Sequence, residues 1–205
     1  MSYANFAALL AAGELPGRDF RIRMNYLATP VAVVAIHGGG IETVTSDVAE
    51  QIAAMTWSSY RFEGIKRSGN SVLHIESEDF DEPLLLWLLK QTQRVVTIHG
   101  TAGTTEETFV GGLDTLVRDR VIASLNTEGF FASIATGDIA GTDPANVTNR
   151  GTTGAGVQLE LTTELRNKLV GTNTAAGRRV TRTPLFYAYT NAVARAVDVQ
   201  NIDQG

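Results

Sequence analysis

Residues 31–40, VAVVAIHGGG, decide the fold of this chain. Six consecutive apolar residues, four of them Val or Ile, precede His37 and three glycines. A continuous β-branched run of this length is typical of a strand buried on both faces of a parallel sheet. Residues 94–103, RVVTIHGTAG, repeat the pattern, with His99 at the end of a second apolar run. The sequence therefore predicts two buried strands that both end in His-Gly.

Around these two strands, strand-like and helix-like segments alternate, which predicts an α/β fold with an open, mostly parallel sheet, mixed at its edges and flanked by helices. The longest segment without periodicity, residues 136–156, is expected to be a functional loop. We expect strands over residues 21–26, 31–36, 59–62, 72–75, 95–98, 108–112 and 157–161. We expect helices over residues 5–12, 48–55, 83–91, 113–125, 162–170 and 184–197.

Length and composition limit the chemistry. The 205 residues suit a single domain over 1–205, and the absence of cysteine excludes disulfides and thiolate metal sites. A net charge of −5 disfavours a nucleic-acid partner. No apolar run is long enough to span a membrane, and the first residues lack the basic region of a secretory signal, so we expect a cytoplasmic protein.

The two His-Gly ends predict a metal site. The carboxyl ends of parallel strands meet at one edge of a sheet, where sites form, so His37 and His99 are expected to converge. Glu42 follows His37 by five residues and can fold back beside it. Two His and one Glu, with a fourth position left for water, form the donor set of a catalytic zinc ion, whereas structural zinc sites usually have four protein ligands.

The His and Gly motifs also have other interpretations. A single buried histidine is usually an ordinary core residue, but the paired strand ends favour ligands. HGGG also occurs in the oxyanion-hole loop of esterases, which need a G-x-S-x-G motif. No serine here has glycine two residues away on both sides. GTAG is similar to a phosphate-binding loop, but neither G-x-x-x-x-G-K-[ST] nor G-x-G-x-x-G is present.

Glu160 is a carboxylate on an expected buried strand, GVQLEL. Such a group is costly unless it is paired, protonated or functional. It could pair with an arginine such as Arg166. Alternatively, it could act as a general base toward metal-activated water.

The ordered motifs of the chain resemble those of a known family. They are AIHGGGIE, YRFEG, LHIESEDFDEP, TIHG, GGLD, NVTNRG and GVQLELTTELR, between about Asp19 and Arg195. This set resembles the poly-γ-glutamate hydrolases of phages and bacilli, zinc-dependent amidohydrolases with a zinc carboxypeptidase-like fold. The resemblance implies an open mixed sheet, one Zn²⁺ ion and hydrolysis of the γ-glutamyl amide bonds of poly-γ-glutamate. The missing basic signal region, which suits a cytoplasmic protein, would suit equally a phage product that is released by host lysis.

The resemblance assigns roles to individual residues. Zinc would lower the pKa of its bound water toward about 7, and Glu160 would take the proton and pass it to the leaving nitrogen. Arg150 would either polarise the amide carbonyl or hold a substrate carboxylate by a bidentate contact. The implied site residues are the zinc ligands His37, Glu42 and His99, the general base Glu160, the pocket residue His74, and the carboxylate-binding pair Asn149 and Arg150.

One departure from the family leaves the substrate open. Glu76 and Glu78 follow the LHI motif, where the family has small hydroxyl residues, and their charge should repel a polyanion. A zinc amidase acting on other acyl-amino-acid or γ-glutamyl peptide bonds is therefore an alternative. A non-catalytic module with a structural or empty site is another. Seven basic residues could line a groove that offsets this charge, or could be ordinary solvated surface charges: Lys66, Arg67, Arg150, Arg166, Arg178, Arg179 and Arg182.

Overall fold

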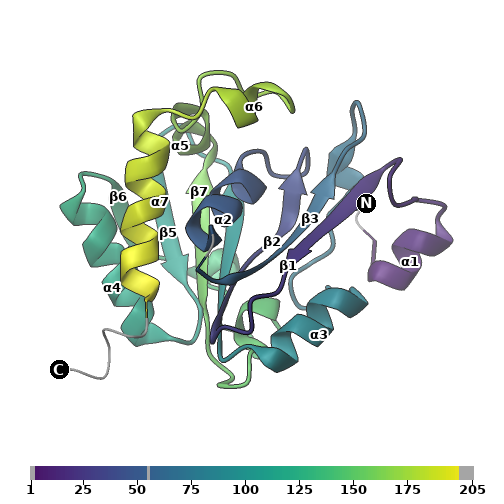
Figure 1. Ribbon diagram of the computed structural model, residues 1–205, viewed down its shortest axis with the longest axis horizontal. Helices are drawn as coiled ribbons and strands as arrows, with labels where there is room; N and C mark the ends of the chain where they lie inside the picture. The colour runs from purple at the N-terminus through teal and green to yellow at the C-terminus, as the bar shows by residue number, and fades with distance from the viewer. Residues whose placement is uncertain (1–2, 55, 199–205) are drawn as a thin grey trace.

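A seven-stranded mixed sheet forms the centre of the protein (Figure 1). The computed structural model describes residues 3–54 and 56–198. The strand order is β1-β3-β2-β4-β7-β5-β6. The strands are β1 (Phe20–Asn25), β2 (Val31–Gly39), β3 (Ser58–Gly64), β4 (Arg94–Thr101), β5 (Glu107–Gly111), β6 (Phe131–Ile134) and β7 (Val157–Thr162).

The sheet is parallel at its centre. Strands β3, β2, β4 and β7 run parallel to one another, and β6 runs parallel to β5. The antiparallel pairs are β1 with β3 and β5 with β7. The predicted α/β fold with a mostly parallel, mixed sheet is therefore confirmed. The carboxyl ends of β2, β4 and β7 lie together at one edge, as the metal-site prediction requires.

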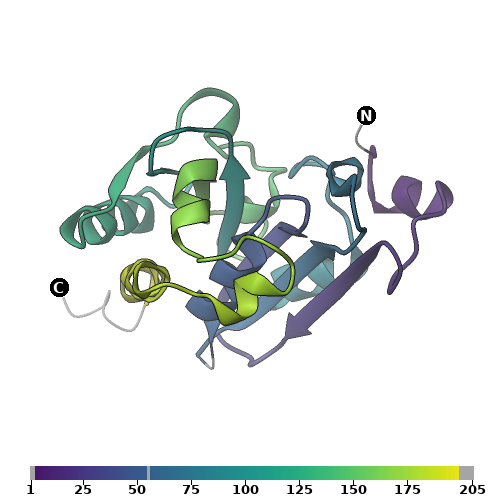
Figure 2. The same ribbon diagram turned by 90° about the horizontal axis from the view of Figure 1, so that it is seen from above.

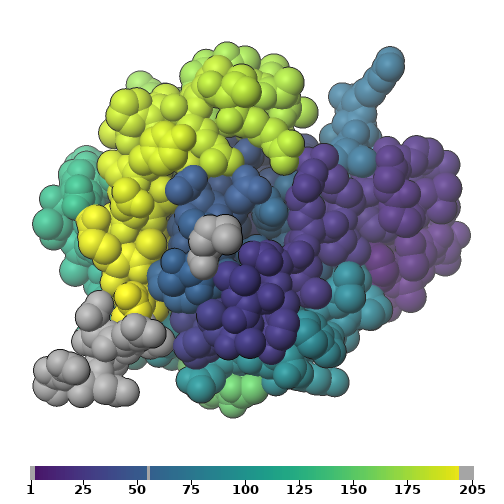
Figure 3. Space-filling model, viewed as in Figure 1, coloured from purple at the N-terminus to yellow at the C-terminus, as the bar shows by residue number. Residues whose placement is uncertain are grey.

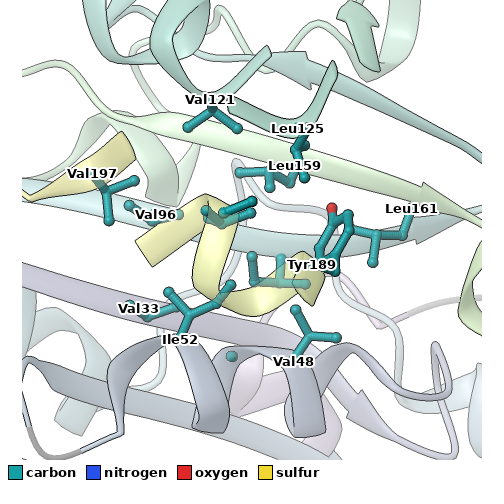
Figure 4. Close-up of a cluster of buried hydrophobic side chains, with 14 of the residues drawn as sticks. Val33, Val48, Ile52, Val96, Val121, Leu125, Leu159, Leu161, Tyr189 and Val197 are labelled. Carbon is teal, nitrogen blue, oxygen red and sulfur yellow. The ribbon is translucent and has the colours of Figure 1, made fainter. Parts of the chain in front are cut away.

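Helices cover both faces of the sheet. One core packs α2, α4, α5 and α7 against residues such as Val33, Val96 and Leu159 (Figure 4). The other packs α1 and α3 against Val34 and Ile36. Figure 2 shows α1 and α4 at opposite ends of the molecule. The helices are α1 (Phe6–Ala11), α2 (Thr45–Ala53), α3 (Pro83–Gln91), α4 (Thr115–Thr127), α5 (Thr163–Lys168), α6 (Gly177–Val180) and α7 (Pro184–Val197).

The strand predicted over residues 72–75 is wrong. The chain there forms a 3₁₀ helix, η1 (Asn70–Leu73), and then runs without strand pairing. Leu73 and Ile75 are fully buried in the core that contains α3. Their apolar pattern therefore reflects packing against the core, not a place in the sheet.

Several element ends differ from the prediction. Leu113 precedes α4, because Asp114 caps that helix by accepting a hydrogen bond from the backbone N–H of Val117 at 3.1 Å. Met55, the predicted end of the second helix, lies outside the described residues, and α2 ends at Ala53. Residues 136–156 form the expected loop, interrupted by the 3₁₀ turns η2 (Gly137–Ile139) and η3 (Val147–Asn149).

The short elements β6 and α6 were not predicted. β6 is an edge strand whose Phe131 is 75% exposed, so it lacks the alternation of a half-buried strand. α6 has only four residues. Within the described ranges, no helix has the length and apolar character needed to cross a membrane.

Candidate metal centre

A β-bulge places His37 on the same face of the sheet as His99. On β4, Val96 and Ile98 point to the core that contains α2, so His99 points to the opposite face. On β2, strict alternation would send His37 toward α2. The register with β3 shifts between Ala35 and Gly38, so β2 carries an extra residue there. The bulge turns His37 toward His99, and their Nδ1 atoms lie 3.2 Å apart.

Glu42 is held against these histidines by backbone contacts. The Gly100 backbone N–H donates to Glu42 Oε2 at 2.7 Å, and the Glu42 N–H donates to the His37 carbonyl at 2.8 Å. Val44, two residues later, has a φ of 78°, which is costly for a β-branched residue. The turn at Gly39 also requires glycine, because its φ is 68° and an added Cβ would lie 2.4 Å from the Gly64 carbonyl oxygen.

Three potential ligand atoms converge at this point. Glu42 Oε1 lies 3.1 Å from His37 Nδ1, and Glu42 Oε2 lies 3.9 Å from His99 Nδ1. The ligand atoms of the three residues all lie within 4.8 Å of one another. His37 Nε2 contacts the Ile75 carbonyl at 2.8 Å, which assigns the ring proton to Nε2 and leaves the Nδ1 lone pair free. His99 Nε2 is buried without a hydrogen-bond partner in the described part of the chain.

This donor set fits a divalent cation. Two imidazole nitrogens and a carboxylate are zinc ligands, and their separations are those of atoms that share one small ion. Without a cation, lone pairs would face each other in a buried space, which is unfavourable. The three predicted ligands are therefore brought together in a group that could hold a metal ion.

The charges of the centre are strongly coupled. Burial alone would raise the pKa of Glu42, but His37 lowers it to about 2. Burial lowers the pKa of His37, and the Glu42 carboxylate more than offsets this, so the net shift is upward. Burial, together with the charge of His37, lowers the pKa of His99 to about 3. His99 is therefore neutral at pH 7, which is the state that binds a metal.

Glu160 lies directly beside His99. The two residues are register partners on the parallel strands β7 and β4, so their side chains project from the same face. Burial and the nearby Glu42 carboxylate raise the pKa of Glu160 to about 8. Gln158 donates from Nε2 to Glu160 Oε1 at 3.0 Å and fixes the carboxyl group.

The alternative ion pair between Glu160 and Arg166 is not formed. Arg166 is buried and donates from Nε to the Leu161 carbonyl at 3.1 Å, from Nη1 to the Thr43 carbonyl at 3.0 Å and from Nη2 to the Thr101 carbonyl at 3.2 Å. It thereby joins the Glu42 loop to the ends of β4 and β7. The sequence does not show this bracing role, because two of the three acceptors, Thr43 and Thr101, are distant from Arg166 in the chain.

A chain of polar side chains behind Glu160 was not predicted. Asn146 Nδ2 donates to Gln158 Oε1 at 3.1 Å and lies 3.3 Å from Glu78 Oε1. Gln158, two residues before Glu160 in VQLELT, was a detectable signal, because alternation puts both on one face. Asn146 and Glu78 join only through tertiary structure.

His74, predicted to be a pocket residue, lies against the metal group, the set of His37, Glu42 and His99. Its ring stacks on that of His37, with centroids 3.8 Å apart, and its Nε2 lies 3.8 Å from Glu42 Oε1. The side chain is 29% exposed, so it borders solvent. Burial and the charge of His37 lower the pKa of His74. On its outer side, Nδ1 lies 3.7 Å from Glu76 Oε1.

Asn149 and Arg150 lie elsewhere in the loop. The Asn149 side chain is buried and makes four backbone hydrogen bonds: it donates to the carbonyls of Gly141 and Asp143, and accepts from the N–H groups of Leu113 and Gly156. Arg150 donates from Nη1 to the Phe80 carbonyl at 3.2 Å. Neither residue has a hydrogen bond to the metal group or Glu160 within the described ranges.

Asn149→Ala is expected to lower the free energy of unfolding by about 2 to 4 kcal/mol, because four backbone groups lose a buried partner at roughly 1 kcal/mol each. Denaturant unfolding measures this. Asn126→Ala is the control, since Asn126 makes two exposed hydrogen bonds to the backbone of Ala132 and should cost about 1 kcal/mol or less. Unchanged stability with a raised KM would instead support the predicted carboxylate-binding role.

This arrangement defines the class of protein. It is an α/β protein with a group that could hold a metal ion at one sheet edge and, beside it, the Glu160 carboxyl, whose pKa is raised to about 8. A metal site next to such a carboxyl is typical of hydrolases. The family model for poly-gamma-glutamate hydrolase matches residues 3–192. The chain therefore belongs to the poly-gamma-glutamate hydrolase family, which cleaves amide bonds. The predicted family resemblance and hydrolase class are confirmed.

Similar proteins agree with this assignment. The SPbeta prophage-derived UPF0714 protein YoqZ of Bacillus subtilis (strain 168) is 36% identical over 96% of this chain and 71% of its own length. The UPF0714 protein YndL of the same organism is 38% identical over 94% of this chain and 76% of its own length.

Two solved structures have nearly the same fold. A bacteriophage poly-gamma-glutamate hydrolase superposes with a TM-score of 0.93 and 33% identity, covering 99% of both chains. Zinc-free apo YndL superposes with a TM-score of 0.91 and 37% identity, covering 97% of this chain and 98% of its own.

Proposed function

We propose that this protein hydrolyses the γ-glutamyl amide bonds of poly-γ-glutamate with one Zn²⁺ ion held by His37, Glu42 and His99. The observation that carries the proposal is the convergence of three ligand atoms within 4.8 Å, next to a protonatable carboxyl, in a member of this family. Zinc is supported by the donor set and by the zinc-free form described for YndL. When bound, zinc would supply Lewis acidity toward water and the amide carbonyl.

Glu160 would move the proton. Its pKa is raised to about 8, which is near neutral pH. A carboxyl whose pKa lies near the working pH can both accept and return a proton. It would take the proton of the attacking water and later deliver it to the leaving nitrogen. Gln158, through its hydrogen bond to Oε1, would keep the other carboxyl oxygen directed at the reaction.

Two further residues would position the substrate. His74 borders both Glu42 and solvent, so it can contact a substrate that approaches the ligands. Arg150 has a single hydrogen bond in the described part of the chain, which leaves guanidinium donors free for a substrate carboxylate. The side-chain amide of Asn149 is fully hydrogen-bonded to backbone groups, so Asn149 would act by holding Arg150 in place.

A second candidate is a zinc amidase that acts on short γ-glutamyl peptides. It is favoured by Glu76, whose side chain is 62% exposed and lies 3.7 Å from His74. A carboxylate at the border of the site repels a long polyanion more than a short peptide.

Chelation of the metal is expected to stop poly-γ-glutamate shortening, and added Zn²⁺ should restore it, because the ion would supply the Lewis acidity toward water and the amide carbonyl. The measurement is metal analysis of the purified protein combined with polymer size with and without chelator. We expect about one zinc per chain, as one three-ligand site implies.

The other outcomes separate the candidates. Stoichiometric zinc with an intact polymer and cleaved short γ-glutamyl peptides would select the amidase. A protein without zinc that shortens the polymer at full rate in chelator would overturn the metal assignment.

A further inference from the structure

A polar cavity lies against the loop that joins two of the proposed metal ligands. It has a volume of about 650 Å³ and is bounded by Gly39 and Gly40 of that loop. Figure 3 shows the chain around α6, in yellow-green, overhanging the blue and purple residues that form the lower wall. Six basic and three acidic side chains line the cavity. A space of this size can hold several units of a small linear ligand.

The acidic residues of the cavity are already paired. Glu50 accepts from Arg61 at 2.6 Å, and Asp47 lies 3.5 Å from Arg178. Glu63 pairs with Arg21 and is buried. These pairs leave an excess of positive charge at the cavity surface.

Lys66 is paired with Glu14 at 2.7 Å, so Arg67 and Arg179 carry that excess. Arg67 follows β3, and Arg179 lies in α6, so the two guanidinium groups come from different walls. Both residues are exposed, and neither has an ion pair or hydrogen bond within residues 3–54 and 56–198. A guanidinium group without a partner offers a planar set of donors that matches a carboxylate.

The cavity lies on the α2 side of the sheet and borders the ligand loop, residues 38–41 between His37 and Glu42. Arg178 Nη2 donates to the Gly39 carbonyl at 3.0 Å, and Asn173 Nδ2 donates to Thr43 Oγ1 at 3.1 Å. Both Arg178 and Asn173 line the cavity. Their contacts fall on either side of Glu42, so an extended chain held in the cavity passes close to the ligand loop.

We propose that this cavity is a binding subsite for the free α-carboxylates of γ-linked glutamyl units some distance along the chain from the scissile bond, with Arg67 and Arg179 as its carboxylate contacts. This inference rests on the proposed function. A γ-linked glutamyl chain keeps one free carboxylate per unit, so consecutive units can meet guanidinium groups on two walls. The subsite supplies local attraction to a protein whose net charge is −5.

The test is the double variant Arg67→Ala/Arg179→Ala in the zinc-loaded protein. KM for long poly-γ-glutamate is expected to rise at least about tenfold while kcat changes less than about threefold, because the lost contacts lie away from the reacting bond. The salt dependence of KM should weaken as well. The control is Lys90→Ala/Arg120→Ala, which removes the same net charge from α3 and α4 outside the cavity and should leave KM within about twofold.

Binding is measured separately from cleavage. The Kd for poly-γ-glutamate is compared between Glu160→Gln and the same protein carrying Arg67→Ala/Arg179→Ala, and should differ at least about tenfold. Polymer shortening with equal KM and Kd in the double variant overturns the subsite and leaves the proposed function intact. Arginine-dependent polymer binding without any shortening by the unmodified protein supports the subsite and overturns the proposed function.

Discussion

His37→Ala is expected to remove metal binding and nearly all amide hydrolysis. His37 is the residue through which Glu42 and His99 are joined, at 3.1 and 3.2 Å from its Nδ1 atom. Loss of outer contacts to metal ligands already costs about 10- to 100-fold in affinity, so loss of a ligand should cost more than about 100-fold. Zinc titration of the apo protein, followed by activity at saturating substrate, measures both effects.

His74→Ala is the matched control for metal content. His74 stacks on His37 but lies outside the three-residue metal group, so its removal should leave about one zinc per chain. The ligand assignment would be wrong if His37→Ala kept zinc at the affinity of the unmodified protein. Equal loss of zinc in both variants would mean that His74 also belongs to the ligand set.

Glu160→Gln is expected to lower kcat by about 10²- to 10⁴-fold while zinc stays bound, because the amide keeps the shape of the side chain but cannot accept a proton. Metal analysis and kinetics on poly-γ-glutamate check this. Glu82→Gln is a matched buried control: Glu82 caps α3 by accepting from the Leu85 N–H at 3.0 Å, away from the metal group, and its kcat should stay within about twofold. A Glu160→Gln enzyme of near-native rate would exclude Glu160 as the base.

The free energy of unfolding, measured against pH, tests the burial of Glu160. The same unfolding curves show whether Glu160→Gln is folded. Burial raises the pKa of Glu160 from 4.5 to about 8, so between these values the folded state keeps a proton that the unfolded state releases. Its contribution therefore lowers stability as pH rises through that window. In the metal-free proteins, Glu160→Gln should gain stability relative to the unmodified chain from about pH 5 to 8. A pH-independent difference would contradict this burial.

Much of the site could be predicted because it depends on local pattern. The two apolar runs ending in His37 and His99 mark buried parallel strands, and parallel strands present their ends at one edge. Alternation in VQLELT likewise places Glu160 on a face opposite Leu159 and Leu161. The same local reasoning made residues 72–75 a strand, because buried apolar residues look alike in a sheet and in a loop that packs on it.

The roles of Asn149 and the basic residues could not be predicted. Asn149 bonds to backbone groups from three parts of the chain, and nothing near it in sequence shows that its amide is fully used. Arg166, Arg178 and Arg67 look equivalent as basic residues. Tertiary contacts make Arg166 a brace and pair Arg178 with Asp47, whereas Arg67 has no partner among the residues that the structure describes.

The sequence by itself determined the α/β alternation, the two strand ends and the identity of the three potential ligands, because each depends on neighbours within a few residues. Only the tertiary structure decided that they meet. The bulge in β2 turns His37 across the sheet, the Gly100 N–H holds Glu42, and the register of β4 with β7 sets Glu160 beside His99. These relations join residues distant in the chain, so they are fixed by strand pairing and packing.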